Sequence, residues 1–323
     1  MFKNKAVNLL KAVTLGLTLS CVATQAVDAA PKFPRKQIQI VVPYAPGGAS
    51  DVVARIYGKE LEKELGKPVV IVNKTGASGA VGLESVKNSR PDGYTMSYMP
   101  VESTMISALG LSDISSNDFS FVCRVMTIPA AITVKADAPW NTLEEFITYA
   151  KENPEKVMIG NSGTGSIWHV AASLSKATGA EFTYVPFDGA APAIAALLGG
   201  NITAVSVSPS EVKANVDAGQ FKVLAVIGDK RSSVVPDVKT TKEMGIDVTA
   251  MGWGGFAVPK GTPDEVVQIL NDASAKVVAT DTVKNLLKER GFEYAYLDGK
   301  DMDAFSAEQL KQYQTLIPEL IKK

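Results

Sequence analysis

The stretch IQIVVPYAPGGASDVVARI (38–56) decides the fold of this 323-residue chain. Its first five residues are apolar or β-branched at every position but one, which predicts a buried strand. A loop with Gly47 and Gly48 follows, and from residue 50 to 65 apolar residues recur every four positions among charged ones. This pattern predicts an amphipathic helix. A strand that turns tightly into a helix is the repeating unit of α/β proteins.

The same alternation continues along the chain and predicts a largely parallel α/β fold. Ser50 or Asp51 is the expected N-cap of the first helix, and Gly66 is its expected C-cap. Further strands are predicted at 68–73, in the β-rich stretch around Cys123, and after each of the helices 142–153, 166–178, 190–198 and 209–217. The predicted helices are 80–89, 142–153, 166–178, 190–198, 209–217 and a C-terminal helical region from about 262 to the end.

Two stretches with the same alternation of strands and helices predict two lobes. The second unit begins after Thr133, and the segment AMGWGGFAVPKGTPDEV (250–266) is typical of a strand that returns to the first. We therefore expect a discontinuous first lobe of residues 30–130 plus 252–323, and a second lobe of residues 131–251.

The first 29 residues are predicted to be a signal peptide. Three lysines precede an apolar run at 12–23 that is too short to span a bilayer, and small residues follow it. Cleavage is expected after Ala29, with Ala26 as the alternative. A lipoprotein anchored through Cys21 is a competing interpretation, but Leu17 lies one place too early for a lipobox. Because no later run of 18 apolar residues follows, we expect a soluble periplasmic protein.

Composition excludes several classes of function. A formal net charge of −1 provides no excess of positive charge for binding nucleic acid. One histidine, His169, and two cysteines cannot form a zinc cluster or a two-histidine metal site. No metal and no organic cofactor are expected. Cys123 loses its only possible partner with the signal peptide, and we interpret it as a small buried hydrophobic residue.

A strand–loop–helix pattern that occurs twice in the sequence suggests how the chain holds a ligand. In residues 41–56 and again in 157–174, an apolar strand runs into a loop of Gly, Ser and Ala that opens onto a helix. Such loops present unpaired backbone N–H groups where the helix dipole favours negative charge. The second loop, NSGTGS (161–166), lacks the third glycine of a dinucleotide fingerprint and the lysine of a Walker loop, and neither NSGTGS nor GASGA (76–80) is a nucleophile elbow. Two loops, one in each lobe, are predicted to hold an anion between them.

His169 carries the enzymatic alternative. It follows Ser166 by three residues, about one helical turn, and so could approach the anion loop. A Ser–His–Asp hydrolase built around His169 would need a serine from another loop and an orienting carboxylate, and no pattern in the sequence marks either.

Seven segments in order resemble the substrate-binding proteins of tripartite tricarboxylate transporters, the Bug or TctC-type periplasmic receptors. The resemblance covers nearly the whole mature chain. The segments are IQIVVPYAPGGASDVVAR (38–55), GKPVVIVNKTGASGAVG (66–82), RPDGYT (90–95), TLEEFITYAKENPEKVMIGNSGTGSIWHVAA (142–172), YVPFDGAAPAIAALLGGNI (184–202), AGQFKVLAVIGDKRSSVVPDVKTTKEMG (218–245) and GFAVPKGTP (255–263).

The resemblance implies a two-lobed, periplasmic-binding-protein type II-like fold, a Venus flytrap with two crossover hinge strands. It also implies a small carboxylate bound in the cleft by backbone groups and small side chains. Carried over by position, the expected ligand-binding residues are Tyr44, Ala45, Gly47, Gly48, Asp51, Ala77, Ser78, Gly79, Ser162, Thr164, Gly165, Ser166, His169, Phe187, Asp188, Ser206 and Ser208. Asp51 would repel a carboxylate, and its expected role is to cap the helix and fix the loop.

The chain departs from the family pattern at Thr75, Glu102 and the pair Phe187-Asp188. If Glu102 and Asp188 both face the cleft mouth, a monocarboxylate or amphoteric ligand is favoured over a dianion; otherwise both are solvated surface charges. Trp168, with Tyr44 and Phe187, raises the alternative of an aromatic ligand packed against rings.

The function expected from the sequence is therefore non-catalytic capture of a small carboxylate by a monomeric receptor. Membrane permease subunits are the expected partners, and no nucleic acid is involved. A receptor of the same fold that feeds a two-component sensor is the non-enzymatic alternative, and the His169-dependent hydrolase is the enzymatic one.

Overall fold

The first strands form a parallel group around β1 (Ile38–Val42). β1 pairs in parallel with β2 (Val69–Asn73) on one side and β3 (Thr95–Pro100) on the other. The computed structural model describes residues 33–170, 174–248 and 250–321, so the predicted signal peptide and Cys21 lie outside the described residues. Residues Pro34–Lys323 belong to one compact unit.

Helix α1 (Ala49–Leu65) follows β1 as the sequence predicts, and it ends at Gly66 in the left-handed conformation. Its N-cap is Gly48, so the prediction of Ser50 or Asp51 as N-cap was wrong. The helix begins one residue before the predicted start at residue 50, and the Asp51 carboxylate reaches back to the loop from the third helical position and accepts the Gly47 N–H. A short 3-10 helix, η1 (Ala77–Gly79), and α2 (Ala80–Lys87) follow β2.

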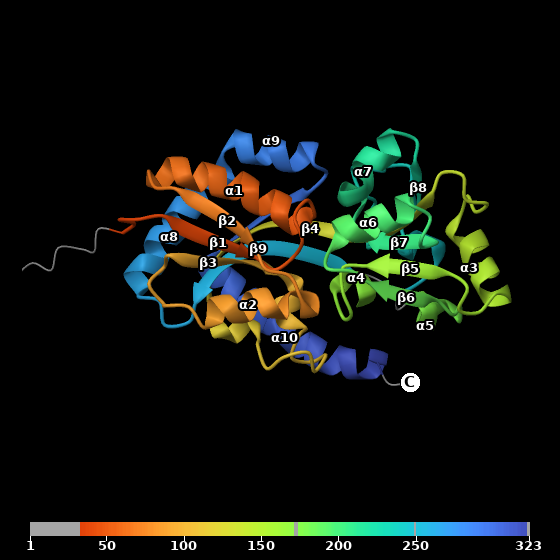
Figure 1. Ribbon diagram of the computed structural model, residues 1–323, viewed down its shortest axis with the longest axis horizontal. Coiled ribbons are helices and arrows are strands. Elements are labelled where there is room, and N and C mark those ends of the chain that lie inside the picture. The colour runs from red at the N-terminus through yellow and green to blue at the C-terminus, as the bar shows by residue number, and fades with distance from the viewer. Residues whose placement is uncertain (1–32, 171–173, 249, 322–323) are drawn as a thin grey trace, which may run out of the picture. The chain divides into compact units, whose positions relative to one another are not determined.

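Two long antiparallel strands connect the first group to the second. β4 (Phe119–Lys135) pairs with β9 (Met251–Pro259) from Phe119 opposite Pro259 to Pro129 opposite Met251. Past Pro129, β4 continues and pairs instead with β7 (Ala204–Val207) and β8 (Phe221–Ile227). Figure 1 shows β4 and β9 running side by side between the two groups of strands. The predicted return strand is thus present; the exact lobe boundaries stay a prediction.

The second group carries β5 (Met158–Asn161) between β7 and β6 (Thr183–Pro186), all parallel. Its helices are α3 (Leu143–Glu152), α4 (Ile167–Val170), α5 (Leu174–Thr178), α6 (Ala190–Leu198) and α7 (Pro209–Asp217). We call the elements around β1–β3 the first lobe and those around β5–β8 the second lobe.

The C-terminal region returns to the first lobe. It contains α8 (Asp264–Ala279), α9 (Asp281–Glu289), β10 (Glu293–Asp298) and α10 (Gly299–Ile321). The sequence predicted only helices here, and β10 corrects that prediction: it pairs antiparallel with β4 next to Cys123. The described residues also form the 3-10 helices η2 (Val101–Thr104), η3 (Ser116–Asp118) and η5 (Lys242–Met244).

Close packing in the first lobe depends on glycines in β9. A Cβ on Gly254 would lie 1.8 Å from the Tyr98 hydroxyl, and one on Gly255 would lie 2.2 Å from the Cys123 carbonyl oxygen. The Phe256 ring stacks on Tyr57 with ring centroids 3.7 Å apart. Cys123 is fully buried, as predicted, and burial raises the pKa of its thiol to about 12.

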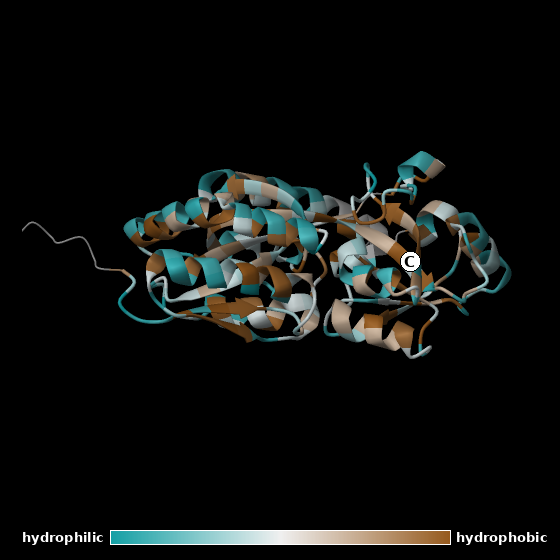
Figure 2. Ribbon diagram, turned by 90° about the horizontal axis from the view of Figure 1, so that it is seen from above, coloured by the Kyte–Doolittle hydropathy of each residue, from teal (hydrophilic) through white to brown (hydrophobic). Residues whose placement is uncertain are grey.

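Figure 2 shows brown, hydrophobic residues along the strands, and both brown and teal residues along the helices. The buried side chains of α1, such as Val53, Tyr57 and Leu61, lie on one face of the helix. In the part of the chain that the structure describes, no helix combines the length and the apolar character that a membrane span requires.

Candidate functional site

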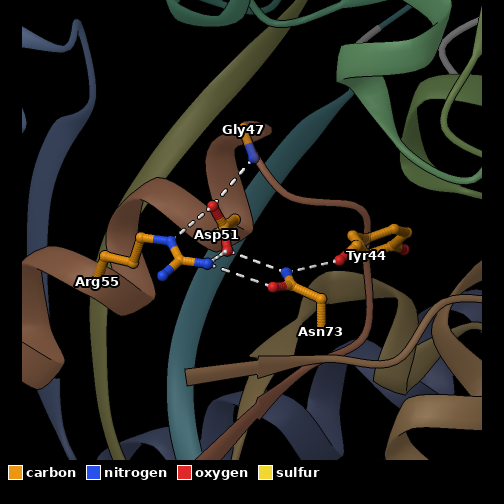
Figure 3. Close-up of polar contacts among 5 residues, drawn as sticks. All are labelled: Tyr44, Gly47, Asp51, Arg55 and Asn73. Atoms are coloured by element: carbon orange, nitrogen blue, oxygen red, sulfur yellow. Dashed lines mark hydrogen bonds and ion pairs between the residues drawn. The ribbon is translucent and has the colours of Figure 1, made fainter. Parts of the chain in front are cut away.

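The first-lobe loop, residues 45–48, is fixed by the Asp51 carboxylate (Figure 3). Gly47 donates its N–H to Asp51 at 3.0 Å, Arg55 donates two hydrogen bonds at 2.9 Å, and Asn73 donates one at 2.9 Å. Burial alone would raise the pKa of Asp51, but the hydrogen bonds from Arg55, Gly47 and Asn73 outweigh it and hold the pKa below its usual value. Asp51 is therefore a charged anchor for the loop.

Asn73 extends this anchor to Tyr44. Its amide donates to the Tyr44 carbonyl oxygen at 2.9 Å, so the residue at the end of β2 holds the start of the β1–α1 loop (Figure 3). The Tyr44 hydroxyl in turn donates to the Ser78 carbonyl oxygen at 3.0 Å. These contacts join the 45–48 loop to the second Gly-rich segment of the first lobe, residues 76–79.

The second-lobe loop, residues 161–166, is held by its own polar side chains. The Asn161 carboxamide oxygen accepts the Gly163 N–H at 2.9 Å, and His169 Nδ1 accepts the Gly165 N–H at 2.8 Å. Gly163 and Gly165 have φ angles of +132° and +76°, which L side chains rarely adopt. Burial lowers the pKa of His169, which keeps the imidazole neutral with Nδ1 as the acceptor.

The loops of the two lobes touch. Ser78 Oγ donates to the Thr164 carbonyl oxygen, and the Ala45 N–H donates to the Asp188 carbonyl oxygen at 3.0 Å. Each contact joins a loop of the first lobe to one of the second, so the cleft between them is closed at these points.

Glu102, which is buried, and Glu211, which is half-buried, make reciprocal contacts across the cleft. Glu102, in η2 of the first lobe, accepts the Ile167 N–H of the second lobe at 2.8 Å. Glu211, in α7 of the second lobe, accepts the Ala49 N–H at the start of α1 at 3.0 Å. Burial raises the pKa of Glu102 to about 7 and also raises that of Glu211, because water no longer stabilises the charged form.

The two glutamate side chains accept the N–H groups of Ile167 and Ala49, which could otherwise bind an anion. Glu211 also completes a capping box with Ser208, the N-cap of α7: its carboxylate accepts the Ser208 N–H at 3.0 Å and the hydroxyl at 2.8 Å. Glu102 is 3 % exposed, so the expectation that it is a solvated surface charge or lies at the cleft mouth was wrong. Asp188, by contrast, is exposed.

Two cavities lie between the loops and share Tyr44 and Ser162 as lining residues. We call the cavity of about 590 Å³ among the Gly-rich segments the outer pocket, and the cavity of about 40 Å³ beside Glu102 and Glu211 the inner pocket. The inner pocket has room for about one water molecule. The described residues that line the inner pocket include Glu102, Glu211, Tyr98, Met126, Trp168 and Trp253.

The expected ligand-binding residues divide into two groups. Those that line a cavity are Tyr44, Gly48, Ala77, Ser78, Gly79, Ser162, Thr164, Phe187 and Asp188. Those that do not line either cavity are Ala45, Gly47, Asp51, Gly165, Ser166, His169, Ser206 and Ser208. Ser206 is fully buried and donates to the Trp168 carbonyl oxygen at 2.8 Å, which holds α4 on β7.

Sequence reasoning missed four important side chains. Arg55 and Asn73 hold Asp51, and Tyr98 and Glu211 line the inner pocket. Two signals were present: Arg55 lies four residues after Asp51, and Ser208-Pro-Ser-Glu211 is a capping-box pattern. Nothing in the local sequence marks Asn73 or Tyr98.

The hydrolase alternative finds no support in the surroundings of His169. Its ring accepts the Gly165 N–H and lies against Tyr184, with centroids 5.1 Å apart. Among the residues that the structure describes, no serine hydroxyl and no carboxylate is hydrogen-bonded to this ring. Within the same ranges, no group of three or more His, Cys, Asp or Glu could hold a metal ion.

Taken together, the fold and the cleft define a two-lobed α/β binding protein whose Gly-rich loops meet across a cavity. The comparison with protein families then gives the particular family: residues 53–321 match the model of the tripartite tricarboxylate transporter family receptor, TctC. The chain belongs to this family, and the resemblance noted in the sequence is confirmed.

Three solved structures place the chain among its relatives. A TctC solute-binding protein from Polaromonas without ligand is 41 % identical, with 89 % of this chain and 99 % of that one covered, at a TM-score of 0.65. MatC from Rhodopseudomonas palustris with bound malate is 26 % identical, with 88 % and 99 % covered, at 0.81. An R. palustris protein with adipate is 27 % identical, with 89 % and 98 % covered, at 0.84. These likenesses confirm the predicted two-lobed fold.

Proposed function

We propose that this chain is a periplasmic receptor that captures a small carboxylate between its lobes and delivers it to the membrane subunits of a tripartite transporter. The receptor works as a monomer and carries out no catalysis. Its N-terminal segment is removed as a signal peptide on export. The ligand enters and leaves chemically unchanged.

One observation carries this proposal: Gly-rich loops from both lobes converge on one cavity. Tyr44, Ser78, Ser162 and Thr164 place hydroxyls or backbone groups around the outer pocket. A carboxylate held by such donors gains about 1.5–3 kcal/mol per charge-assisted hydrogen bond. Relatives that hold malate and adipate support a carboxylate as the ligand.

The state of the cleft supports a receptor that opens and closes. Despite the lower sequence identity, the chain superposes better on the adipate-bound relative than on the ligand-free Polaromonas protein. The inner pocket of about 40 Å³ is too small for a ligand body of four carbons or more, so the lobes must separate before such a ligand can extend from the outer loops into it.

A thermal-shift screen of residues 30–323 against carboxylates, amino acids and sugars tests the proposal. A ligand at about a hundred times its dissociation constant adds about 2.7 kcal/mol of stability, which gives a clear rise in Tm. We expect stabilisation by carboxylates only, with the ligand recovered intact by mass spectrometry. Chemical turnover of the ligand, or stabilisation by sugars alone, would refute the proposed function.

A further inference from the structure

Glu102 and Glu211 bring two carboxyl groups into the inner pocket of a receptor for anions. They come from opposite lobes, and each side chain accepts a backbone N–H of the other lobe. We propose that these two glutamates make the receptor selective for ligands with a single carboxylate and against dicarboxylates. This inference rests on the proposed function and names the substrate class of the same cleft.

The first step of the argument is the position of the two groups. Glu102 is 3 % exposed, and both glutamates line the inner pocket together with Ser50 and Tyr98. Each uses one carboxylate oxygen, at 2.8 Å and 3.0 Å, for an N–H that lies next to a Gly-rich loop. The protein's own carboxylates therefore already occupy two donors that a second ligand carboxylate would need.

The second step is the charge balance of the cavity. No Lys, Arg or His is found among the described residues that line the inner or the outer pocket. Arg55, which lies near the loop, is hydrogen-bonded to both oxygens of Asp51. A dicarboxylate that fills the cleft would bring one of its charges next to Glu102 and Glu211 in a region from which water is largely excluded, and no cation would compensate it.

The third step is the composition of the inner wall. Met126, Ile128, Trp168 and Trp253 line the inner pocket beside the two glutamates. When the cleft opens, this wall offers apolar surface to the body of a ligand whose carboxylate is held at the outer loops. A ligand with a carboxylate at one end and an uncharged remainder therefore fits both the outer loops and the apolar inner wall.

Matched ligand pairs test this selectivity directly. The dissociation constants of butyrate and succinate, hexanoate and adipate, and benzoate and terephthalate are measured by calorimetry for the wild type at a pH of about 8.5, above the pKa of about 7 that burial gives Glu102. The same titrations use Glu102→Gln, Glu211→Gln and the double variant. Glutamine keeps the size of the side chain and one oxygen that can accept the N–H of the other lobe, although in Glu211→Gln the Ser208 N–H loses its acceptor. Glu181→Gln, on the exposed surface of the second lobe, is the charge-matched control.

We expect the wild type to bind the monocarboxylate of at least one pair about tenfold or more tightly than its dicarboxylate, and the double variant to lower that ratio about tenfold. Glu181→Gln should leave the ratio unchanged. Equal or tighter dicarboxylate binding by the wild type would overturn the inference while the proposed function stands, as would a ratio that the double variant does not change. Failure of every carboxylate to bind the wild type would overturn both. The ratio of the two dissociation constants in the wild type tests the inference even if a variant fails to fold.

Discussion

At the scale of single residues, Asp51 shows how one carboxylate organises a binding loop without touching the cavity. Its two oxygens accept hydrogen bonds from Gly47, Arg55 and Asn73, which belong to the loop, the helix and the neighbouring strand. The sequence analysis assigned Asp51 the role of fixing the loop, and the structure agrees. Its partners were missed because Asn73 meets Asp51 only after β2 has paired with β1.

Replacement of Asp51 by Ala leaves the Gly47 N–H and the Asn73 amide without their acceptor. We expect a loss of about 2–3 kcal/mol in the free energy of unfolding, measured by urea denaturation at pH 7. Asp217→Ala is the matched control, because Asp217 also pairs with a basic residue four positions away, Lys213, but on the surface. Its expected cost is about 0.5 kcal/mol. Equal losses in the two variants would contradict the anchoring role.

Glu102 should give stability a measurable dependence on pH. Its pKa is about 7 in the folded protein because of burial, against an ordinary value of 4.5. Since the folded state binds the proton more tightly, Glu102 contributes stability that is fully present below about pH 4.5 and is lost as pH rises through about 7. The titratable groups that interact with it are Tyr44, Tyr98, Glu211, and Tyr313 on α10.

The Glu102→Gln variant tests this dependence. Between pH 4.5 and 7 the wild type should lose stability with a slope that approaches one proton, about 1.4 kcal/mol per pH unit, relative to the variant. Urea denaturation of both proteins at several pH values measures the difference. Parallel stability curves for the two proteins over this range would count against a raised pKa at Glu102.

At the scale of elements, the sequence predicted what local patterns control. Helices α6 and α7 begin and end where periodicity and the flanking glycines placed them, to within about one residue. β10 was missed because the segment EYAYLD becomes a strand by pairing with β4, far away in the chain. The sequence also did not predict that β4 continues through Pro129, since proline normally interrupts a strand. The strand accommodates this proline because β4 changes its pairing partner there, from β9 to β7.

Gly47 tests the local geometry of the 45–48 loop. Its φ of +88° is nearly the same as that of Gly261, which lies in a turn after β9 with no atom close to its Cβ position. Alanine at either position should cost about 1–2 kcal/mol of stability, because both adopt left-handed backbone. Only Gly47→Ala should also weaken carboxylate binding, by about tenfold, since it distorts the 45–48 loop, whose Gly48 lines the cavity. Equal affinities of the two variants would contradict the role of the loop.

At the scale of the whole molecule, the site depends on contacts that the sequence could not reveal. Glu102 and Ile167 are 65 residues apart, and Ala49 and Glu211 are 162 apart. The sequence predicted that two Gly-rich loops would face each other, because each loop follows a local rule for strand, turn and helix. Which side chains reach across the cleft depends on how the lobes come together, and one sequence carries no pattern for that.

Closure of the lobes can be locked by a designed disulfide. A Cβ on Gly48 would lie 4.0 Å from the Ala190 Cβ across the cleft, within the range of about 3.5–4.5 Å for a disulfide, and Gly48 has an ordinary φ of −79°. The oxidised Gly48→Cys/Ala190→Cys variant should bind no carboxylate, and reduction should restore binding. The reduced double variant controls for the substitutions themselves. Undiminished ligand binding by the oxidised form would show that entry does not require the lobes to separate.

The structure of residues 30–323 with the carboxylate that stabilises the protein most tests the central claim most directly. The account predicts electron density for the ligand between the lobes, with its carboxylate against the loops at 45–48, 76–79 and 161–166 and its uncharged end toward Met126 and Trp168. A ligand bound outside this cleft, or held by loops of one lobe alone, would contradict the account.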